Sequence, residues 1–242
     1  MFIYGKNPVF EYLKFRLKDL KRIYTCDLSI KNEIEKKYNI TVIEKDKNFI
    51  ISRLDNPHSP HQNIIAELEM SNIISIETLI GKTLNLNSNH KTIVILDHLS
   101  DPHNFGAIIR SAVFFKAAGI LLAKDRQVPL NPTVIKASSG MAALTDFCIV
   151  SNINNALEKL KKNNFWIYAA VASDGIPPIK IDVSMPIGLI VGNEGEGPKN
   201  LTVKNADFKV NIQGCSDVDS LNVSVSTAIL LYQISINHQP VK

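Results

Sequence analysis

The chain has 242 residues, 45% of them hydrophobic and 21% charged, which is the composition of an ordinary globular protein with one large domain or two small ones. Its formal net charge of +4 permits an anionic partner, and its three scattered cysteines argue against a disulfide framework or a structural zinc site. The first residues lack a basic leader followed by an apolar run, and no apolar stretch approaches the roughly 18 residues of a membrane helix, so we expect a cytoplasmic protein that does not enter a membrane.

Residues 1–70 are expected to form a small α/β domain. The predicted elements are a helix over 8–17, a strand over 22–25, a charged helix over 31–38, and strands over 41–43 and 63–68. Basic residues recur at helical spacing near the start of this domain, opposite an apolar set; they are Lys14, Lys18, Lys21 and Arg22. This pattern predicts one basic helix face, which either binds nucleic-acid phosphates or is an ordinary solvated surface.

Residues 71–90 are predicted to link two domains. The stretch is rich in Asn, Ser and Thr and contains one predicted helical turn near 76–80. We therefore place the domain boundary in this linker and the second domain over 91–242.

The second domain alternates strand patterns with helical ones. Five runs are apolar throughout, as expected of strands covered on both faces; they span 92–96, 119–123, 147–150, 166–171 and 188–191. Helical periodicity is clearest in Ile153, Ala156, Leu157 and Leu160. The predicted fold class is therefore an α/β layer sandwich around a mostly parallel sheet.

The first of three polar segments follows a buried strand that is predicted to end at Asp97. A turn comes next, and a helix is expected to begin near Asn104, which is either a helix cap or a ligand-binding side chain. Arg110 is one of five arginines among 27 basic residues, and its planar fork suits a phosphate or a ribose hydroxyl. His98 and His103 are weaker candidates for a general base.

The second polar segment follows the apolar run 188–191 and holds three glycines, Gly192, Gly195 and Gly197. Glycine lets the backbone approach a ligand closely. The order of residues does not match the dinucleotide fingerprint, and the two neighbouring carboxylates would repel a pyrophosphate. A neutral or cationic ligand is favoured, with Glu194 as the functional carboxylate and Glu196 solvated.

The third polar segment contains Ser220, Leu221 and Asn222 and precedes a predicted helix through Ala228 and Ile234. Ser220 and Asn222 are each either a helix cap or a functional side chain, and spacing alone leaves both possibilities open.

In their order and separation, these three segments resemble the signature motifs of the SpoU-type RNA 2′-O-ribose methyltransferases, a branch of the SPOUT superfamily. The stretch Lys124-Asp125-Arg126 with Leu130-Asn131 is most similar to the subgroup that methylates a guanosine ribose in 23S ribosomal RNA. The resemblance implies S-adenosylmethionine as cofactor, no metal, a homodimer and a C-terminal trefoil knot. It also implies that residues 1–70, from Ile3-Tyr4-Gly5 onward, form a ribosomal-protein-like RNA-binding domain.

The same resemblance implies roles for individual residues. Those expected to hold S-adenosylmethionine, mainly through backbone groups, are Gly192, Ile212 and Leu221. Those expected to form the catalytic and substrate-orienting set are Asn104, Arg110, Glu194, Ser220 and Asn222. Arginine stays protonated in proteins, so Arg110 is expected to bind a phosphate and stabilise the developing alkoxide rather than act as the base.

Two departures from the subgroup stand out. Residues 212–216 read Ile-Gln-Gly-Cys-Ser where Ile-Pro-Met, a small residue and Gly are usual, which puts the rigidity of the cofactor loop in doubt. Asn63 stands where Gly is usual, and asparagine tolerates the positive φ of a turn. A tRNA 2′-O-methyltransferase and a non-catalytic ribosome-assembly factor of the same fold remain alternatives.

Overall fold

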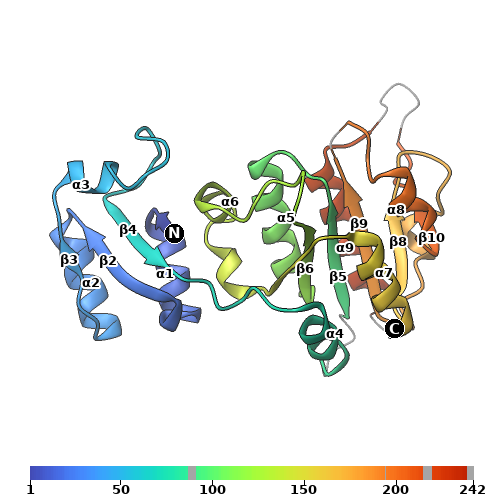
Figure 1. Cartoon of the computed structure of the whole chain (residues 1–242), viewed down its shortest axis with the longest axis horizontal. Helices are drawn as coiled ribbons and strands as arrows, with labels where there is room; N and C mark the ends of the chain where they lie inside the picture. Colours follow the sequence, from blue (N-terminus) through green and yellow to red (C-terminus); the bar gives the residue numbers. More distant parts are fainter. Residues whose placement is uncertain (87–90, 194, 215–219, 239–242) are drawn as a thin grey trace. The chain divides into compact units, whose positions relative to one another are not determined.

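The computed structural model describes residues 1–86, 91–193, 195–214 and 220–238 (Figure 1). Its internal contacts divide the chain into two compact units. The first unit comprises Met1–Ser71 with Leu130–Leu144, and the second comprises Asn72–Pro129 with Thr145–Lys242. The first unit thus ends close to the expected residue 70, but it also takes in a segment from the second half of the chain that the sequence assigned to the other domain.

The first unit is built on a four-stranded mixed sheet in the order β1-β4-β2-β3. The strands are β1 (Phe2–Tyr4), β2 (Leu20–Thr25), β3 (Ile43–Glu44) and β4 (Ile64–Leu68). The helices are α1 (Lys6–Phe15), α2 (Leu28–Tyr38), α3 (Lys47–Ile51) and α6 (Pro132–Ala137), with 3₁₀ turns at η1 (Leu17–Asp19) and η2 (Met141–Leu144). β4 runs antiparallel to both of its neighbours, and its Ile65 belongs to a buried cluster with Tyr4, Tyr24 and Ile50.

The prediction that Lys14, Lys18, Lys21 and Arg22 form one basic helix face is wrong. Helix α1 ends at Phe15 because Arg16 leaves helical geometry, with φ −143° and ψ 50°. Lys18 therefore lies in η1, whereas Lys21 and Arg22 lie on β2. The four basic residues do not share one helical surface, because the chain turns after α1 to pair β2 with β4.

The turn before β4 behaves as the sequence predicts. Asn63 adopts a φ of 64°, in the left-handed region that asparagine tolerates, and Gln62 before it has a φ of 52°. The backbone N–H of Asn63 donates to His61 Nδ1 at 3.1 Å. The asparagine therefore supports the conformation for which the subgroup uses glycine.

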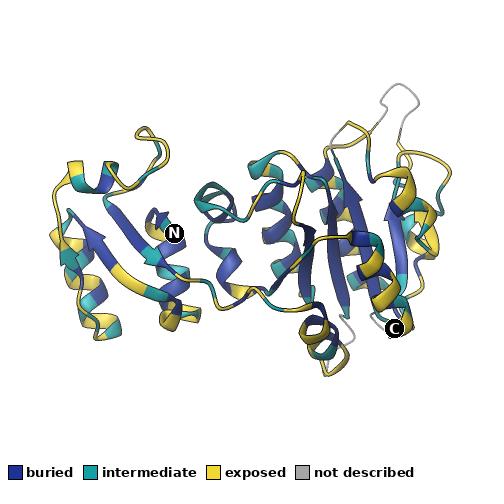
Figure 2. Cartoon of the chain, viewed as in Figure 1, coloured by how far each residue is buried: buried dark blue, intermediate teal, exposed yellow. Residues whose placement is uncertain are grey.

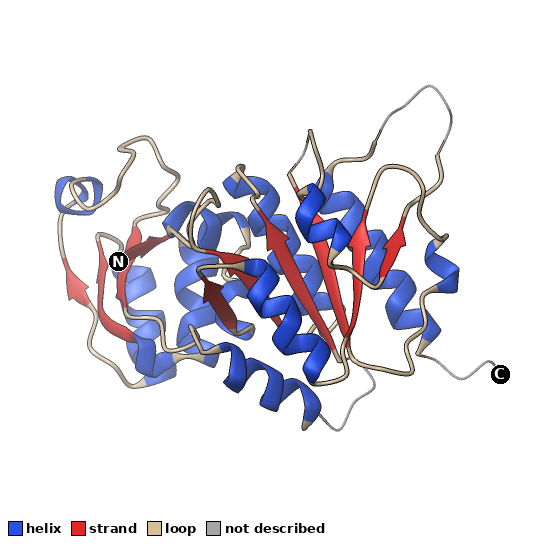
Figure 3. Ribbon diagram, turned by 45° about the vertical axis from the view of Figure 1, so that its right-hand side comes forward, coloured by secondary structure: helices blue, strands red, loops and turns tan. Residues whose placement is uncertain are grey.

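The second unit contains a six-stranded sheet in the order β10-β8-β9-β5-β6-β7, parallel throughout (Figure 3). Its strands are β5 (Thr92–Asp97), β6 (Gly119–Ala123), β7 (Phe147–Val150), β8 (Trp166–Ala170), β9 (Ile187–Gly192) and β10 (Phe208–Val210). The two central strands, β5 and β9, are buried along their whole length (Figure 2). The predicted α/β class with a mostly parallel sheet is confirmed.

Helices flank this sheet. They are α4 (Ile76–Leu84), α5 (Pro102–Phe114), α7 (Ile153–Lys162), α8 (Asn200–Lys204) and α9 (Val223–Asn237), with a 3₁₀ turn at η3 (Pro178–Lys180). The crossovers β5-α5-β6 and β7-α7-β8 run in opposite directions across the sheet, so right-handed connections place α5 and α7 on opposite faces. Helix α9 packs against α5 and β9. Within the described residues, no helix has both the length and the apolar character needed to cross a membrane.

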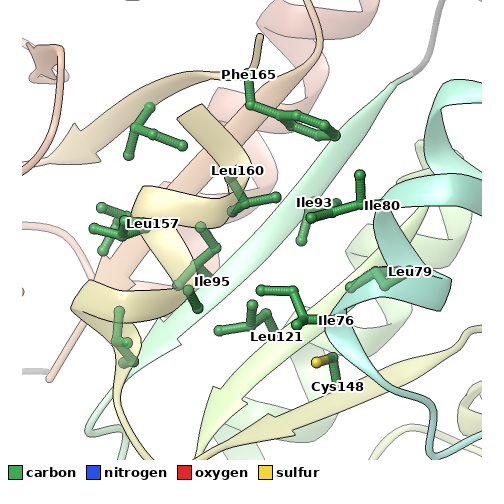
Figure 4. Packing of buried hydrophobic residues seen from close by; sticks show 14 of the residues in the cluster. Ile76, Leu79, Ile80, Ile93, Ile95, Leu121, Cys148, Leu157, Leu160 and Phe165 are labelled. Atoms are coloured by element: carbon green, nitrogen blue, oxygen red, sulfur yellow. The ribbon is translucent and has the colours of Figure 1, made fainter. Parts of the chain in front are cut away.

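The stretch expected to be a linker contributes to the core of the second unit instead. Ser75 caps α4 by accepting from the Thr78 N–H, and Ile76, Leu79 and Ile80 then form one apolar face. These side chains pack with β5 and α7 in the cluster of Figure 4. Local composition hid this helix because its polar flanks resemble a linker, whereas the sheet provides the apolar surface that its buried face requires.

Candidate functional site

A cavity of about 430 Å³ opens at the carboxyl ends of three neighbouring strands, β8, β9 and β10. This edge of a parallel sheet is where ligands bind in open α/β folds. Four of the residues expected to bind the cofactor or to take part in catalysis line the cavity: Gly192, Ile212, Ser220 and Leu221. The structure therefore brings together residues from two of the three polar segments.

Gly192 ends β9 and is required by close packing. A Cβ atom at this position would lie 2.0 Å from the carbonyl carbon of Gly197 and 2.0 Å from the nitrogen of Pro198. Asn193 and Gly197 exchange two backbone hydrogen bonds of 3.1 and 2.9 Å, and Gly197 has a φ of 68°. The loop after β9 thus folds back onto its own strand, which only glycine at position 192 permits.

Another part of the cavity lining was not expected from the sequence. It comes from the loop after β8, where Ser173 and Asp174 line the cavity, and Lys209 on β10 lines it as well. The apolar run of β8 was the one sequence signal that could have identified these residues. A loop at the carboxyl end of a strand that lies beside β9 must be at the same edge of the sheet as Gly192. Glu196, expected to be solvated, is exposed and lines the cavity too, whereas Glu194 lies outside the described residues.

Asn104 and Asn222, from the first and third polar segments, are hydrogen-bonded to each other. The side-chain amide of Asn222 donates to the side-chain oxygen of Asn104 at 3.0 Å. Asn222 is also the N-cap of α9, whereas α5 is capped by Asp101, so the capping alternative holds for Asn222 and not for Asn104. Ser220 lies two residues before the cap and does not cap α9.

Arg110 lies deeper in its helix than expected. Helix α5 begins at Pro102, so Arg110 is beyond its first two turns, where its side chain is exposed and does not line the cavity. The guanidinium is therefore accessible to a large ligand that approaches from solvent.

Two histidines considered as general bases lie outside the cavity lining. His103 is exposed, and its backbone N–H donates to the capping Asp101. The imidazole of His98 instead lies between the carboxylate of Asp97 and the ammonium group of Lys199. Sequence reasoning missed the contributions of Asp97 and Lys199, because they are 102 residues apart and no local pattern links them.

Comparison with known proteins places this arrangement in a family. Residues 91–232 match the model of the SpoU rRNA Methylase family. An uncharacterized tRNA/rRNA methyltransferase of Synechocystis is 35% identical over 238 residues, covering 96% of this chain, which spans 61% of that protein's length. The 23S rRNA (guanosine-2′-O-)-methyltransferase RlmB of Pseudomonas aeruginosa is 27% identical over 247 residues, covering 99% of this chain and 98% of RlmB.

Solved structures share the fold over nearly the whole chain. The SpoU methyltransferase AviRb from Streptomyces viridochromogenes superposes with a TM-score of 0.81 at 17% identity, covering 98% of this chain and 89% of AviRb. An AdoMet-bound rRNA methyltransferase from Sinorhizobium meliloti gives a TM-score of 0.78 at 21% identity, covering 99% of this chain and 88% of that protein. The family match covers more than half of the sequence and includes β5 to β10, the residues that line the cavity and the asparagine pair. The chain therefore belongs to the SpoU rRNA methylase family.

Proposed function

We propose that this chain transfers a methyl group from S-adenosylmethionine to the ribose 2′-hydroxyl of a guanosine in 23S ribosomal RNA. The observation that carries the proposal is the cavity at the ends of β8, β9 and β10, which the motif residues line beside the Asn104–Asn222 pair. Family membership supports methyl transfer to RNA, and the roles of the individual residues are part of the proposal.

The cavity suits S-adenosylmethionine in size and chemistry. Its volume of about 430 Å³ lies in the range of small-molecule sites. Gly192 lets the loop after β9 pack closely at the cavity wall, and the apolar side chains of Ile212 and Leu221 suit an adenosine. The two carboxylates at the lining, of Asp174 and Glu196, outnumber its one ammonium group, of Lys209, and this excess of negative charge favours a cation such as a sulfonium. When bound, the cofactor supplies an electrophilic methyl group on sulfur.

The chain's own residues would prepare the ribose. The exposed guanidinium of Arg110 binds the phosphate next to the target nucleotide and stabilises negative charge as the hydroxyl loses its proton. Asn104 and Asn222, with Ser220 and Glu194, orient the ribose beside the cofactor. The proton leaves through phosphate or water, because guanidinium does not act as a base. Fixing both reactants supplies much of the rate.

Ribosomal RNA is favoured over tRNA as the substrate by the extent of the matches. The alignment with RlmB covers 99% of this chain and therefore includes the first unit. The A. aeolicus TrmH/SpoU tRNA modifying enzyme matches 67% of this chain, with a TM-score of 0.55. A relative built like this chain along its whole length thus acts on 23S rRNA.

We also propose that the first unit selects the RNA. Lys18 and Arg22 are exposed on it, and the guanidinium of Arg53 lies over the rings of Phe2 and Phe49, 5.7 and 5.1 Å from their centroids. Cations interleaved with aromatic rings bind phosphates and stack on bases. The segment Leu130–Leu144 groups with this unit and is included in it.

A homodimer is part of the proposal. Helices α5 and α9 pack together and leave large apolar side chains exposed, with Phe114 78% exposed, Tyr232 54% and Val225 46%. Such a patch on adjacent helices suits a symmetric partner surface. Light scattering should give twice the 26.9 kDa mass of the chain at micromolar concentration, and a monomer alone would contradict the proposal. The C-terminal knot and the cytoplasmic location stay predictions.

The decisive experiment maps ribose methylation. In cells with and without the protein, we expect one guanosine of 23S rRNA to lose its 2′-O-methyl group when the protein is absent, and the purified protein to restore it on unmodified RNA. Loss of a tRNA methylation instead would favour the tRNA alternative. Unchanged methylation, together with association with ribosomal precursors, would favour the non-catalytic assembly factor.

A further inference from the structure

The carboxylate of Asp97 is fully buried at the end of β5, and it is bound from two sides. The backbone N–H of Lys199 donates to its Oδ2 at 2.8 Å, and the Nδ1 atom of His98 contacts its Oδ1. A buried carboxylate is retained only where such partners replace water. Asp97 therefore holds two segments of the chain that lie 102 residues apart in sequence.

The backbone of His98 has a φ of 65°, in the left-handed region that residues other than glycine rarely adopt. Its Nε2 atom lies 2.7 Å from the ammonium nitrogen of Lys199. Because an ammonium group can only donate, Nε2 must accept, and the ring proton must then reside on Nδ1, where it is donated to Asp97. The neutral imidazole thus bridges lysine and aspartate in one fixed tautomer.

These three residues tie both ends of the loop that follows β9. At its start, Gly192 is the direct ladder partner of Asp97 in the parallel pair β5–β9. At its end, Lys199 immediately follows Pro198, which lines the cavity together with Gly197. The loop that forms one wall of the cavity is therefore attached to β5 through Asp97 at both points.

We infer that Asp97, His98 and Lys199 form a clamp that holds this loop in its ligand-binding shape, and that they act as positioning residues for S-adenosylmethionine. His98 is accordingly not the general base. The inference rests on the proposed cofactor.

The test uses the full chain and two measurements, neither of which needs RNA. Calorimetry measures the affinity for S-adenosylmethionine, and hydrogen–deuterium exchange of the ligand-free protein measures opening of residues 195–199. His98→Gly removes the bridge while giving position 98 the residue best suited to its φ. We expect roughly tenfold weaker cofactor binding, the equivalent of one charge-assisted hydrogen bond, and faster amide exchange in the loop.

Lys199→Met should give the same two effects, because it removes the ammonium group but keeps the backbone N–H that binds Asp97. Lys199→Arg keeps a donor for His98 Nε2 and should restore most of the affinity. The double variant His98→Gly/Lys199→Met should lose little more affinity for S-adenosylmethionine than either single variant, since both substitutions break the same bridge. Asn164→Gly is the matched control: it places glycine at another left-handed position, which is exposed and has a φ of 61°, and it should change neither measurement.

Wild-type affinity and exchange in both His98→Gly and Lys199→Met would overturn the clamp, as would equal losses in Lys199→Arg and Lys199→Met. The exchange measurement decides the clamp even if the wild-type protein does not bind S-adenosylmethionine, a result that would instead refute the proposed cofactor. A protein that binds the cofactor but methylates no RNA would refute only the proposed function.

Discussion

The side-chain amide of Asn222 donates a 3.0 Å hydrogen bond to the side-chain oxygen of Asn104, joining the start of α9 to the first turn of α5. The side-chain oxygen of Asn222, Oδ1, accepts hydrogen bonds from the backbone N–H groups of Ser224 and Val225. One residue thus caps a helix and, with its remaining donor, fixes a side chain 118 positions earlier in the chain. This contact joins the first polar segment to the third.

Substitutions of Asn222 can separate its role as the cap of α9 from its role in binding the side chain of Asn104. Asn222→Ser keeps a capping oxygen but is too short to reach Asn104, so methyl transfer should fall while the free energy of unfolding changes little. Asn222→Ala removes both functions and should cost about 1 kcal/mol of stability in addition. Single-turnover methylation and chemical denaturation measure the two effects. Equal turnover in Asn222→Ser and the wild type would show that the bond to Asn104 has no functional part.

Gly192→Ala should abolish cofactor binding. Its Cβ would lie 2.0 Å from backbone atoms of Gly197 and Pro198, so the loop would have to leave the cavity wall. Calorimetry with S-adenosylmethionine provides the measurement. Gly81→Ala is the matched control, because nothing lies within 4 Å of its added Cβ and the residue is in the middle of α4. The control should bind the cofactor normally and gain about 0.5–1 kcal/mol of stability; weakened binding in both variants would refute the close-packing explanation.

Arg110→Lys should lose turnover by a factor on the order of 100, comparable to removing one preorganised donor at a reacting oxygen. Lysine keeps the charge but loses the planar fork. Affinity for S-adenosylmethionine should stay unchanged, since Arg110 does not line the cavity. Methylation assays and calorimetry on the same preparation separate the two. Wild-type turnover in Arg110→Lys would contradict the proposed phosphate contact.

Neutralising Lys14, Lys18 and Arg22 to glutamine should weaken RNA binding and flatten its salt dependence. Each lost phosphate contact should remove about 0.7 from the log–log slope for single-stranded RNA. A matched triple variant of Lys159, Lys161 and Lys162 on α7 changes the net charge equally on the second unit. If the two triple variants changed the slope by the same amount, the first unit would not be the one that selects RNA.

Acidification should destabilise the first unit through His61. Burial, with the nearby charges of Lys47 and Lys136, lowers the pKa of His61 below its ordinary value of 6.5. The unfolded chain then binds the proton more readily than the folded one, so stability is fully present above pH 6.5 and decreases as the pH falls below it. Protonation of Nδ1 also removes the acceptor of the Asn63 N–H. His61→Asn keeps an acceptor but does not titrate, so its unfolding free energy should depend less on pH between 7.5 and 5.5; identical pH dependence in both proteins would be evidence against this role.

Local pattern was sufficient for the sheet of the second unit and for much of the cavity. The runs that form β5 and β9 are apolar because both faces of these strands are covered, and such a run can be recognised from consecutive residues alone. Gly192 stands directly after such a run, so its place at the carboxyl edge could be predicted. The cap formed by Asn222 is likewise a local signal, although its second partner is not.

Tertiary structure decided the rest. The end of α1 at Phe15 follows from pairing between β2 and β4, and the helix α4 within the expected linker depends on the apolar surface of a sheet formed later in the chain. The contacts Asn104–Asn222 and Asp97–Lys199 arise because β9 lies beside β5 and α9 packs against α5. Strand order is set by the free energy of burying whole elements together rather than by any short segment, so residues more than 100 positions apart meet without a local sign of it.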